Sequence, residues 1–193
     1  RPEDEVRCLE LGAVDFIRKP YNVRIVKGKI NSVIKLRESA IVLSALEYDE
    51  LTGLYIRQAF FHHAKTLMRV KKDQKFHVVV ADVKNFKWIN GTYGEKTGDQ
   101  VLAYLGEAYK SQVHSGMVAR YGGDQFVAIV YGDLNFGKDK VEAAIRKIAE
   151  QAPISNLSVN YGIYENVDKT LPLTLICDRA FLAMKSIQND YEH

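Results

Sequence analysis

Two short apolar runs joined by a pair of glycines constrain the fold of this chain more than any other feature. Residues 117–119 and 127–131 flank a segment that contains Gly122, Gly123 and Asp124. Glycine reaches the positive backbone φ that tight hairpin turns need, so the pattern predicts a β-hairpin. An acid at the tip of a hairpin is common, and Asp124 taken alone is typical of a solvent-exposed turn.

A second apolar run also ends in an acid. Residues 76–83 are apolar on both faces, which predicts a strand in the centre of a sheet, and Asp82 lies near its end. Neighbouring strands could bring Asp82 beside Asp124, and two carboxylates from different strands suit a hard divalent cation such as Mg²⁺. The alternative for Asp82 is an ordinary acid at a strand end.

Helical patterns surround these strands. Apolar spacing of three and four predicts helices over residues 58–70, 100–113, 138–151 and 173–187, and a further strand is predicted over 157–164. This order predicts an α+β fold, in which helices surround a mostly antiparallel central sheet. Residues 84–98 are expected to form a loop and the start of a helix, with Asp99 suited to cap a helix that begins at Gln100.

Residues 22–48 predict one long linker helix. The segment has no proline, and apolar residues recur at helical spacing at Val26, Ile30, Val33, Ile34, Ile41, Ala45 and Tyr48. A helix with such a stripe buries it either on its own domain or against a second copy in a coiled coil. The sequence leaves both alternatives open.

Composition excludes several classes of protein. The chain is 47% hydrophobic and 26% charged, which is typical of a globular protein rather than a disordered one. The net charge of +3 is too small to indicate a nucleic-acid partner, and we expect no membrane span in this segment. Two cysteines, Cys8 and Cys177, make no disulfide framework, so we expect a reduced, cytoplasmic protein.

Three stretches in order resemble the GGDEF domain of diguanylate cyclases, a bacterial signalling family that joins two GTP molecules into cyclic di-GMP. They are residues 49–57, residues 76–99 and residues 120–126. The resemblance covers residues 48–188 and implies a nucleotidyl-cyclase palm-like fold, with a GGDEF domain over 49–189. It also implies GTP as ligand or substrate and Mg²⁺ or Mn²⁺ as cofactor.

The resemblance implies roles for the matching side chains. Asp82, Asp124 and the backbone carbonyl of Val83 would bind the metal, and Asp124 and Lys185 are the catalytic candidates. The metal would neutralise triphosphate charge while a 3′-hydroxyl attacks the α-phosphate.

The nucleotide-binding candidates are Asn90, Asp99, Lys87, Gly122 and Gly123. The resemblance implies that Asn90 and Asp99 read guanine, and a carboxylate can accept both N–H groups on the edge of that base. Lys87 and Lys185 are candidates for phosphate contacts, and the alternative for each is an ordinary surface lysine. The two glycines leave room for phosphate to approach the backbone.

The chain also departs from the family pattern. Gln125 replaces the glutamate after the glycine–glycine–aspartate run, Gly91 replaces an aspartate, and Asn189 replaces an arginine. A product-inhibition motif expected at Val113 and Gly116 is absent. Three functions therefore stay open: a degenerate GTP-binding regulatory module, an active diguanylate cyclase, and a scaffold that binds no nucleotide. We expect the regulatory module, because Gln125 removes a negative charge from a cation site.

Residues 1–21 resemble the end of a response-regulator receiver domain, in which a strand is followed by a pair such as Lys19 and Pro20. The alternative is an ordinary turn with a solvent-exposed lysine. The resemblance implies a two-component signalling protein of which this chain is a fragment, with a phosphorylated aspartate upstream. We expect a homodimer through the linker helix or the GGDEF face, and a phosphodiesterase (EAL) domain downstream.

Overall fold

The computed structural model describes residues 22–45, 47–132 and 137–189, together with residues 7, 10, 11, 13, 17, 19 and 20. The chain divides into two compact units, residues 1–45 and residues 46–193. The receiver-like pattern predicted for residues 1–21 therefore lies almost entirely outside the described residues.

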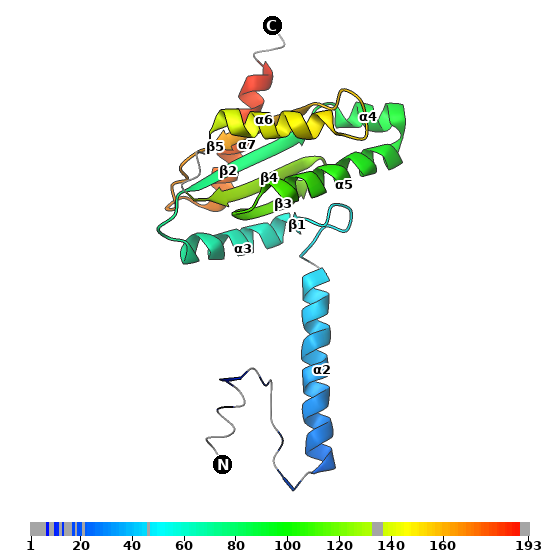
Figure 1. Cartoon of the computed structure of the whole chain (residues 1–193), viewed down its shortest axis with the longest axis vertical. Helices are drawn as coiled ribbons and strands as arrows, with labels where there is room; N and C mark the ends of the chain where they lie inside the picture. The colour runs from blue at the N-terminus through cyan, green and yellow to red at the C-terminus, as the bar shows by residue number, and fades with distance from the viewer. Residues whose placement is uncertain are drawn as a thin grey trace. The chain divides into compact units, whose positions relative to one another are not determined.

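The first unit contains one long helix, α2 (Val23–Ala45) (Figure 1). The side-chain oxygen of Asn22 accepts the backbone N–H groups of Arg24 at 3.0 Å and Ile25 at 3.4 Å, so it caps the helix. The predicted linker helix is confirmed, but its predicted end is wrong. Helix α2 stops at Ala45, and Tyr48 instead forms an isolated β-bridge with Tyr55.

The second unit contains a five-stranded sheet in the order β1–β3–β4–β2–β5. The strands are β1 (Tyr55–Ile56), β2 (Phe76–Val83), β3 (Gly116–Gly122), β4 (Gln125–Tyr131) and β5 (Val159–Tyr164). Only the short pair β1–β3 is parallel, and the other three pairs are antiparallel. The predicted mostly antiparallel sheet is confirmed, and so is the predicted hairpin, β3–β4.

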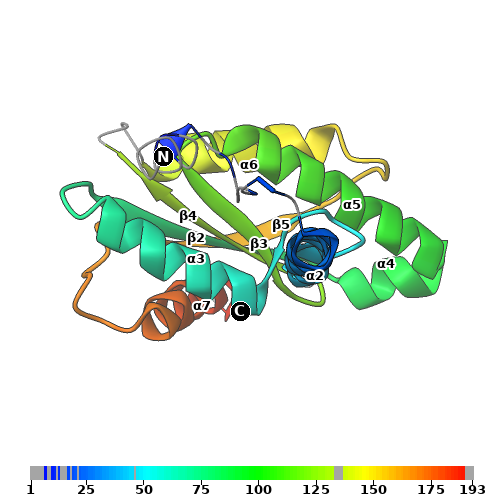
Figure 2. The same ribbon diagram turned by 90° about the horizontal axis from the view of Figure 1, so that it is seen from below.

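Five helices surround this sheet: α3 (Arg57–Val70), α4 (Phe86–Tyr93), α5 (Glu95–Gln112), α6 (Lys138–Glu150) and α7 (Leu173–Asn189). Figure 2 shows α3 and α7 on one face of the sheet and α5 and α6 on the other. Strand β2 is apolar on both sides because it serves two cores: Val78 and Val80 pack with α3 and α7, whereas Ala81 and Val83 pack with α5. None of the helices in the described part of the chain has both the length and the apolar character of a membrane span.

The segment between β2 and α5 differs from its prediction. Residues 84–98, predicted as a loop and a helix start, form α4 and the first turn of α5. Gly94 separates the two helices. Its φ is 86°, a conformation that residues with a side chain rarely adopt, so glycine suits this position. Helix α5 begins at Glu95, so the predicted start at Gln100 is wrong, and the alternative role of Asp99 as the cap of that helix is excluded.

Candidate functional site

Two acidic side chains meet at the end of the central strand. Asp82 is the last but one residue of β2, and the register places it opposite Gln125, the first residue of β4. Asp124 immediately precedes Gln125 in the turn of the hairpin. Burial raises the pKa of the Asp124 carboxyl, and the negative charge of Asp82 raises it further. The sheet therefore brings the two predicted carboxylates together.

A neutral amide contacts one of these carboxylates. Nε2 of Gln125 donates a hydrogen bond of 3.1 Å to Oδ2 of Asp82. This contact satisfies one carboxylate oxygen without adding a negative charge beside Asp82 and Asp124. The sequence indicates the missing charge at Gln125, but not that its amide bonds to Asp82.

A second amide lies on the other side of Asp82, and it was not predicted. Asn160 of β5 pairs with Asp82 in the register, so the acid lies between the amides Gln125 and Asn160. Paired residues of neighbouring strands project from the same face of a sheet. Asn160 could have been identified in the sequence as a polar amide within a strand whose other residues are valine, isoleucine, tyrosine and glycine.

The oxygens at this end of the sheet fit a hard divalent cation. Asp82 and Asp124 supply carboxylates, and the carbonyl of Val83 is next to Asp82 in the chain. Among the described residues, no group of three or more histidine, cysteine, aspartate or glutamate side chains is placed to hold a metal. Two carboxylates are nevertheless a usual set for Mg²⁺, which takes its remaining ligands from water and phosphate. These residues therefore suit a cation that arrives together with a phosphate compound.

The hairpin turn next to the acids is open on its outer side. Gly123 has φ of 58°, in the left-handed region that favours glycine. A Cβ atom at Gly122 or Gly123 would meet no atom within 4 Å, and both residues are exposed. The backbone of the turn is therefore accessible from solvent.

Arg120 ties this turn to the segment near the start of the unit. Its Nε donates a hydrogen bond of 2.9 Å to the carbonyl oxygen of Gly123, and its Nη1 lies 3.1 Å from both carboxylate oxygens of Asp49. Oδ1 of Asp49 also accepts the N–H of Thr52 at 2.9 Å and its hydroxyl at 2.8 Å. Burial alone would raise the pKa of Asp49, but these hydrogen bonds and the charge of Arg120 hold the pKa below its ordinary value. The sequence did not predict this ion pair.

The predicted guanine-reading residues lie on two helices that pack together. Asn90 is in α4, Asp99 is in α5, and a Cβ atom at Gly98 would overlap Oδ1 of Asn90. That oxygen is buried, and no hydrogen-bond partner for it lies within the described residues. A buried acceptor normally has a partner, so a donor on a ligand would satisfy Asn90. Asp99, in contrast, is exposed and free to meet a ligand from solvent.

The two predicted lysines are both exposed, on different helices. Lys87 precedes Asn90 by three residues in α4, so the two side chains lie on the same face of that helix. Lys185 is in α7, and no ion pair within the described part of the chain joins it to Asp82 or Asp124. Lys87 therefore belongs with the Asn90 group, whereas the structure shows no link between Lys185 and the acids.

The sequence is similar to those of a known family. The sequence profile described as "Diguanylate cyclase, GGDEF domain" matches residues 46–190. Diguanylate cyclase DgcP of Escherichia coli is 32% identical over 122 residues, which is 59% of this chain and 36% of DgcP. Diguanylate cyclase DgcS of Shewanella oneidensis is 30% identical over 141 residues, or 64% of this chain and 48% of DgcS. This chain thus spans less than half the length of these curated relatives.

One similar solved structure contains the coiled coil and GGDEF domain of DgcB from Caulobacter crescentus in complex with c-di-GMP. The two structures superpose with a TM-score of 0.69, covering 86% of this chain and 94% of DgcB, at 22% sequence identity. At that identity the similarity shows a shared fold.

Proposed function

Because this chain belongs to the GGDEF family of diguanylate cyclases, we propose that it is a cyclic di-GMP signalling domain that binds GTP and regulates a larger protein rather than synthesising the messenger itself. One observation carries the proposal. Gln125 stands where the family motif has a glutamate, and its amide bonds to Oδ2 of Asp82. The acids that would hold a cation are present, but the third negative charge is replaced by a neutral donor.

Guanine recognition would rest on Asn90 and Asp99. The exposed carboxylate of Asp99 can accept both N–H groups on the edge of guanine, and the buried oxygen of Asn90 lacks a donor that a base could supply. Adenine would leave these polar groups unpaired, so the site would select GTP over ATP. Lys87, on the face of Asn90, would attract the phosphates.

The phosphate end of the nucleotide would lie at the hairpin. Asp82, Asp124 and the carbonyl of Val83 would hold Mg²⁺ or Mn²⁺, and Gly122 and Gly123 would let phosphate approach the backbone. When bound, such a cation neutralises triphosphate charge and supports attack on the α-phosphate. The carboxylates of this chain position that cation, while Gln125 lowers the negative charge available to it.

The test compares wild type with Gln125→Glu. GTP is titrated into each protein by calorimetry with MgCl₂, and each is then incubated with GTP at high concentration while the products are separated. We expect both to bind GTP and only Gln125→Glu to form cyclic di-GMP. Gln112→Glu is the control, because Gln112 is exposed at the end of α5. A dissociation constant above about 1 mM for GTP and wild type would contradict the proposal. The remaining function would then be that of a scaffold that binds no nucleotide.

Retention of both acids favours a second candidate, an active diguanylate cyclase. Asp82 and Asp124 meet at the strand ends, as a cation site for catalysis requires. In that case Asp124 and Lys185 would be the catalytic residues, and wild type would form cyclic di-GMP in the same assay. Lys185→Ala would then reduce the rate of synthesis without abolishing GTP binding.

We also propose a domain organisation and partners for this chain: a receiver remnant over 1–21, a linker segment that contains helix α2, and a GGDEF domain over 49–189. Ile30, Ile34 and Ile41 lie along α2 and are 50%, 47% and 62% exposed, which supports pairing with the same helix of a second copy. A downstream EAL domain would be the regulated partner. Analytical ultracentrifugation of wild type beside Ile34→Asp tests the pairing.

A further inference from the structure

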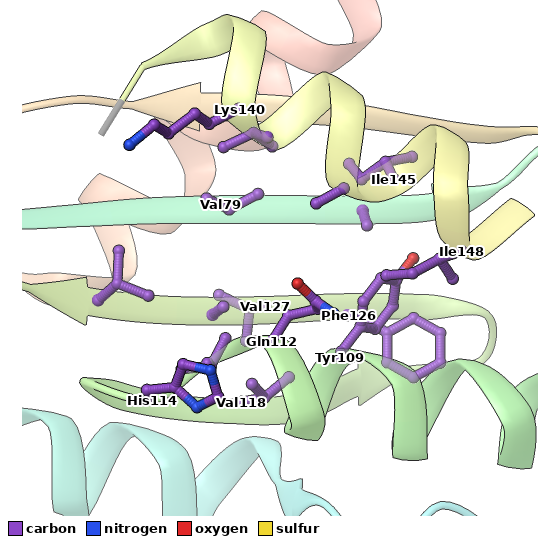
Figure 3. A pocket seen from close by; sticks show the side chains of 16 residues that line it. Val79, Tyr109, Gln112, His114, Val118, Phe126, Val127, Lys140, Ile145 and Ile148 are labelled. Atoms are coloured by element: carbon purple, nitrogen blue, oxygen red, sulfur yellow. The ribbon is translucent and has the colours of Figure 1, made fainter. Parts of the chain in front are cut away.

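A cavity of about 550 Å³ lies on the face of the sheet that α5 and α6 cover. Its floor is formed by β2, β3 and β4, its roof by α6, and one side by the last turns of α5 (Figure 3). Cavities of this size accept small organic molecules. The space is partly open to solvent, so a small molecule could enter it without unfolding of the domain.

The lining of the cavity is aliphatic. Eleven of its sixteen residues are valine, alanine or isoleucine, and two more, Tyr109 and Phe126, contribute rings. Along α6, Val141, Ala144 and Ile145 face the space without being fully buried. Such walls match a flexible hydrocarbon chain, which gains affinity by removing apolar surface from water.

Among the described residues, the cavity has one charged side chain in its lining, Lys140. In Figure 3 Lys140 lies on α6 and His114 lies across the cavity from it, both on the side away from Tyr109, Phe126 and Ile148. Among the lining residues, all of which belong to the described part of the chain, Lys140 alone carries a formal charge at pH 7. Its ammonium is exposed, so it can meet a single anionic group at the mouth of the cavity.

We propose that this cavity binds a free aliphatic carboxylate, with the hydrocarbon chain between α6 and the sheet and the carboxylate at Lys140. The other end also offers a hydrogen bond, because the Tyr109 hydroxyl is buried and no partner for it lies within the described residues. A chain that bears an oxygen near its far end would accept that O–H group. Saturated chains would bind through the apolar walls and Lys140 alone.

The proposal is independent of nucleotide binding. Ala81 of β2 and Phe126 of β4 line the cavity. Their neighbours in the chain, Asp82 and Gln125, project from the opposite face of the sheet, because successive side chains of a strand alternate between its faces. The carboxylate would therefore bind across β2 and β4 from the cation site, and beside the last turns of α5 rather than the first turns that hold Asp99, so it would not compete with GTP.

The test uses dodecanoate below its micellar concentration, titrated by calorimetry into the whole chain. Ala144→Phe fills the cavity and should weaken dodecanoate at least about tenfold. Ala143→Phe is the matched control, because Ala143 is exposed on α6, does not line the cavity, and should bind like wild type. Equal weakening in both variants, or no binding by wild type, would overturn the proposal.

A charge variant keeps the test decisive should Ala144→Phe fail to fold. Lys140→Gln should weaken dodecanoate about three- to tenfold and leave the neutral alcohol dodecanol unchanged, because only the acid meets the ammonium. Lys147→Gln, exposed on the same helix and outside the cavity, should change neither ligand. An equal effect of Lys140→Gln on acid and alcohol would overturn the proposed orientation. Binding to phosphatidylglycerol vesicles without binding to dodecanoate would assign the acyl chain to a membrane lipid and overturn the proposal of a free acid.

Discussion

Gln125 lies directly across from Asp82 at the paired ends of β4 and β2, and its Nε2 donates a 3.1 Å hydrogen bond to Oδ2 of that acid. The amide gives Asp82 a partner, yet the charge of Asp82 still acts on Asp124. Burial and that charge together raise the pKa of Asp124, against opposing effects of a backbone N–H and Arg120. An ionised Asp124 therefore destabilises the folded domain, and a bound cation would offset this.

Asp124→Asn should stabilise the protein at pH 7. The amide keeps the shape of the side chain and removes the unfavourable charge, so we expect a gain of less than about 1 kcal/mol because the group is partly exposed to solvent. The same variant should lose any Mg²⁺-dependent increase in GTP affinity. Thermal unfolding and GTP calorimetry, each with and without MgCl₂, measure the two effects.

The gain from Asp124→Asn should depend on pH. The folded state binds the Asp124 proton more tightly than the unfolded state, whose pKa is near 3.8. Wild-type stability is therefore lost as pH rises from about 3.8 through the raised folded pKa, so the gain of the variant over wild type grows through that window and is complete above it. Asp139→Asn is a control of opposite sign, since Asp139 lies in the first turn of α6, where a negative charge is favourable. Equal Tm values for Asp124→Asn and wild type at pH 7 would contradict the prediction.

Arg120→Lys should destabilise the domain by roughly 1–2 kcal/mol. Lysine keeps the charge but cannot reach Gly123 and both oxygens of Asp49 at once, as the guanidinium does. Arg146→Lys is the matched control: Arg146 is 69% exposed and lies 3.9 Å from Glu142, so its replacement should change stability by no more than a few tenths of a kcal/mol. Chemical denaturation measures both changes, and equal effects would contradict a special role for Arg120.

The effect of Arg120→Lys should shrink in acid. The pKa of Asp49 is lowered in the folded state, so its contribution is present above 3.8 and is lost as pH falls through the folded pKa. Denaturation curves at pH 7 and near pH 3 measure this loss. A difference between wild type and variant that stays constant over this range would mean that Arg120 acts through packing rather than through its ion pair.

Most of the fold could be predicted from the sequence, because the strands and the long helices have strong local patterns of apolar residues. Residues 76–83 were predicted as a central strand with the observed bounds, since valine on both faces requires two covering layers. Helix α4 was missed because its eight residues include Gly91 and two β-branched residues, which disfavour helix. Packing of Ile89 into the core decides the conformation there instead.

Contacts between distant segments lay beyond the sequence patterns. Strand β1 has two residues and exists through its pairing with Ala119 and Arg120, so no local periodicity marks it. The ion pair between Asp49 and Arg120 joins residues 71 positions apart. Predicted site residues such as Asp82 came from the family motifs, whereas the flanking amide of Asn160 follows from the register alone.

Asp99→Asn should weaken GTP binding about tenfold or more, because an amide can accept only one of the two N–H groups on guanine while presenting a donor to the other. ATP binding should not change. Glu107→Gln is the control, because Glu107 is exposed on the same helix and its replacement by glutamine removes the same charge. Calorimetry with both nucleotides measures the effect. Equal losses for the two variants would mean that Asp99 acts only through general charge.

Gly98→Ala should both destabilise the domain and weaken GTP binding. The added Cβ would overlap Oδ1 of Asn90, with the ring of Phe86 only 3.2 Å away, so either the Asn90 side chain or α4 must move. Overpacking of this kind costs about 1–3 kcal/mol, more than the gain of roughly 1 kcal/mol in helix propensity from glycine to alanine. Gly91→Ala is the matched control: a Cβ there meets no atom within 4 Å, so only the propensity gain remains and Tm should rise. A stability increase in both variants would show that Asn90 has room to move, and GTP affinity would then report whether its position matters.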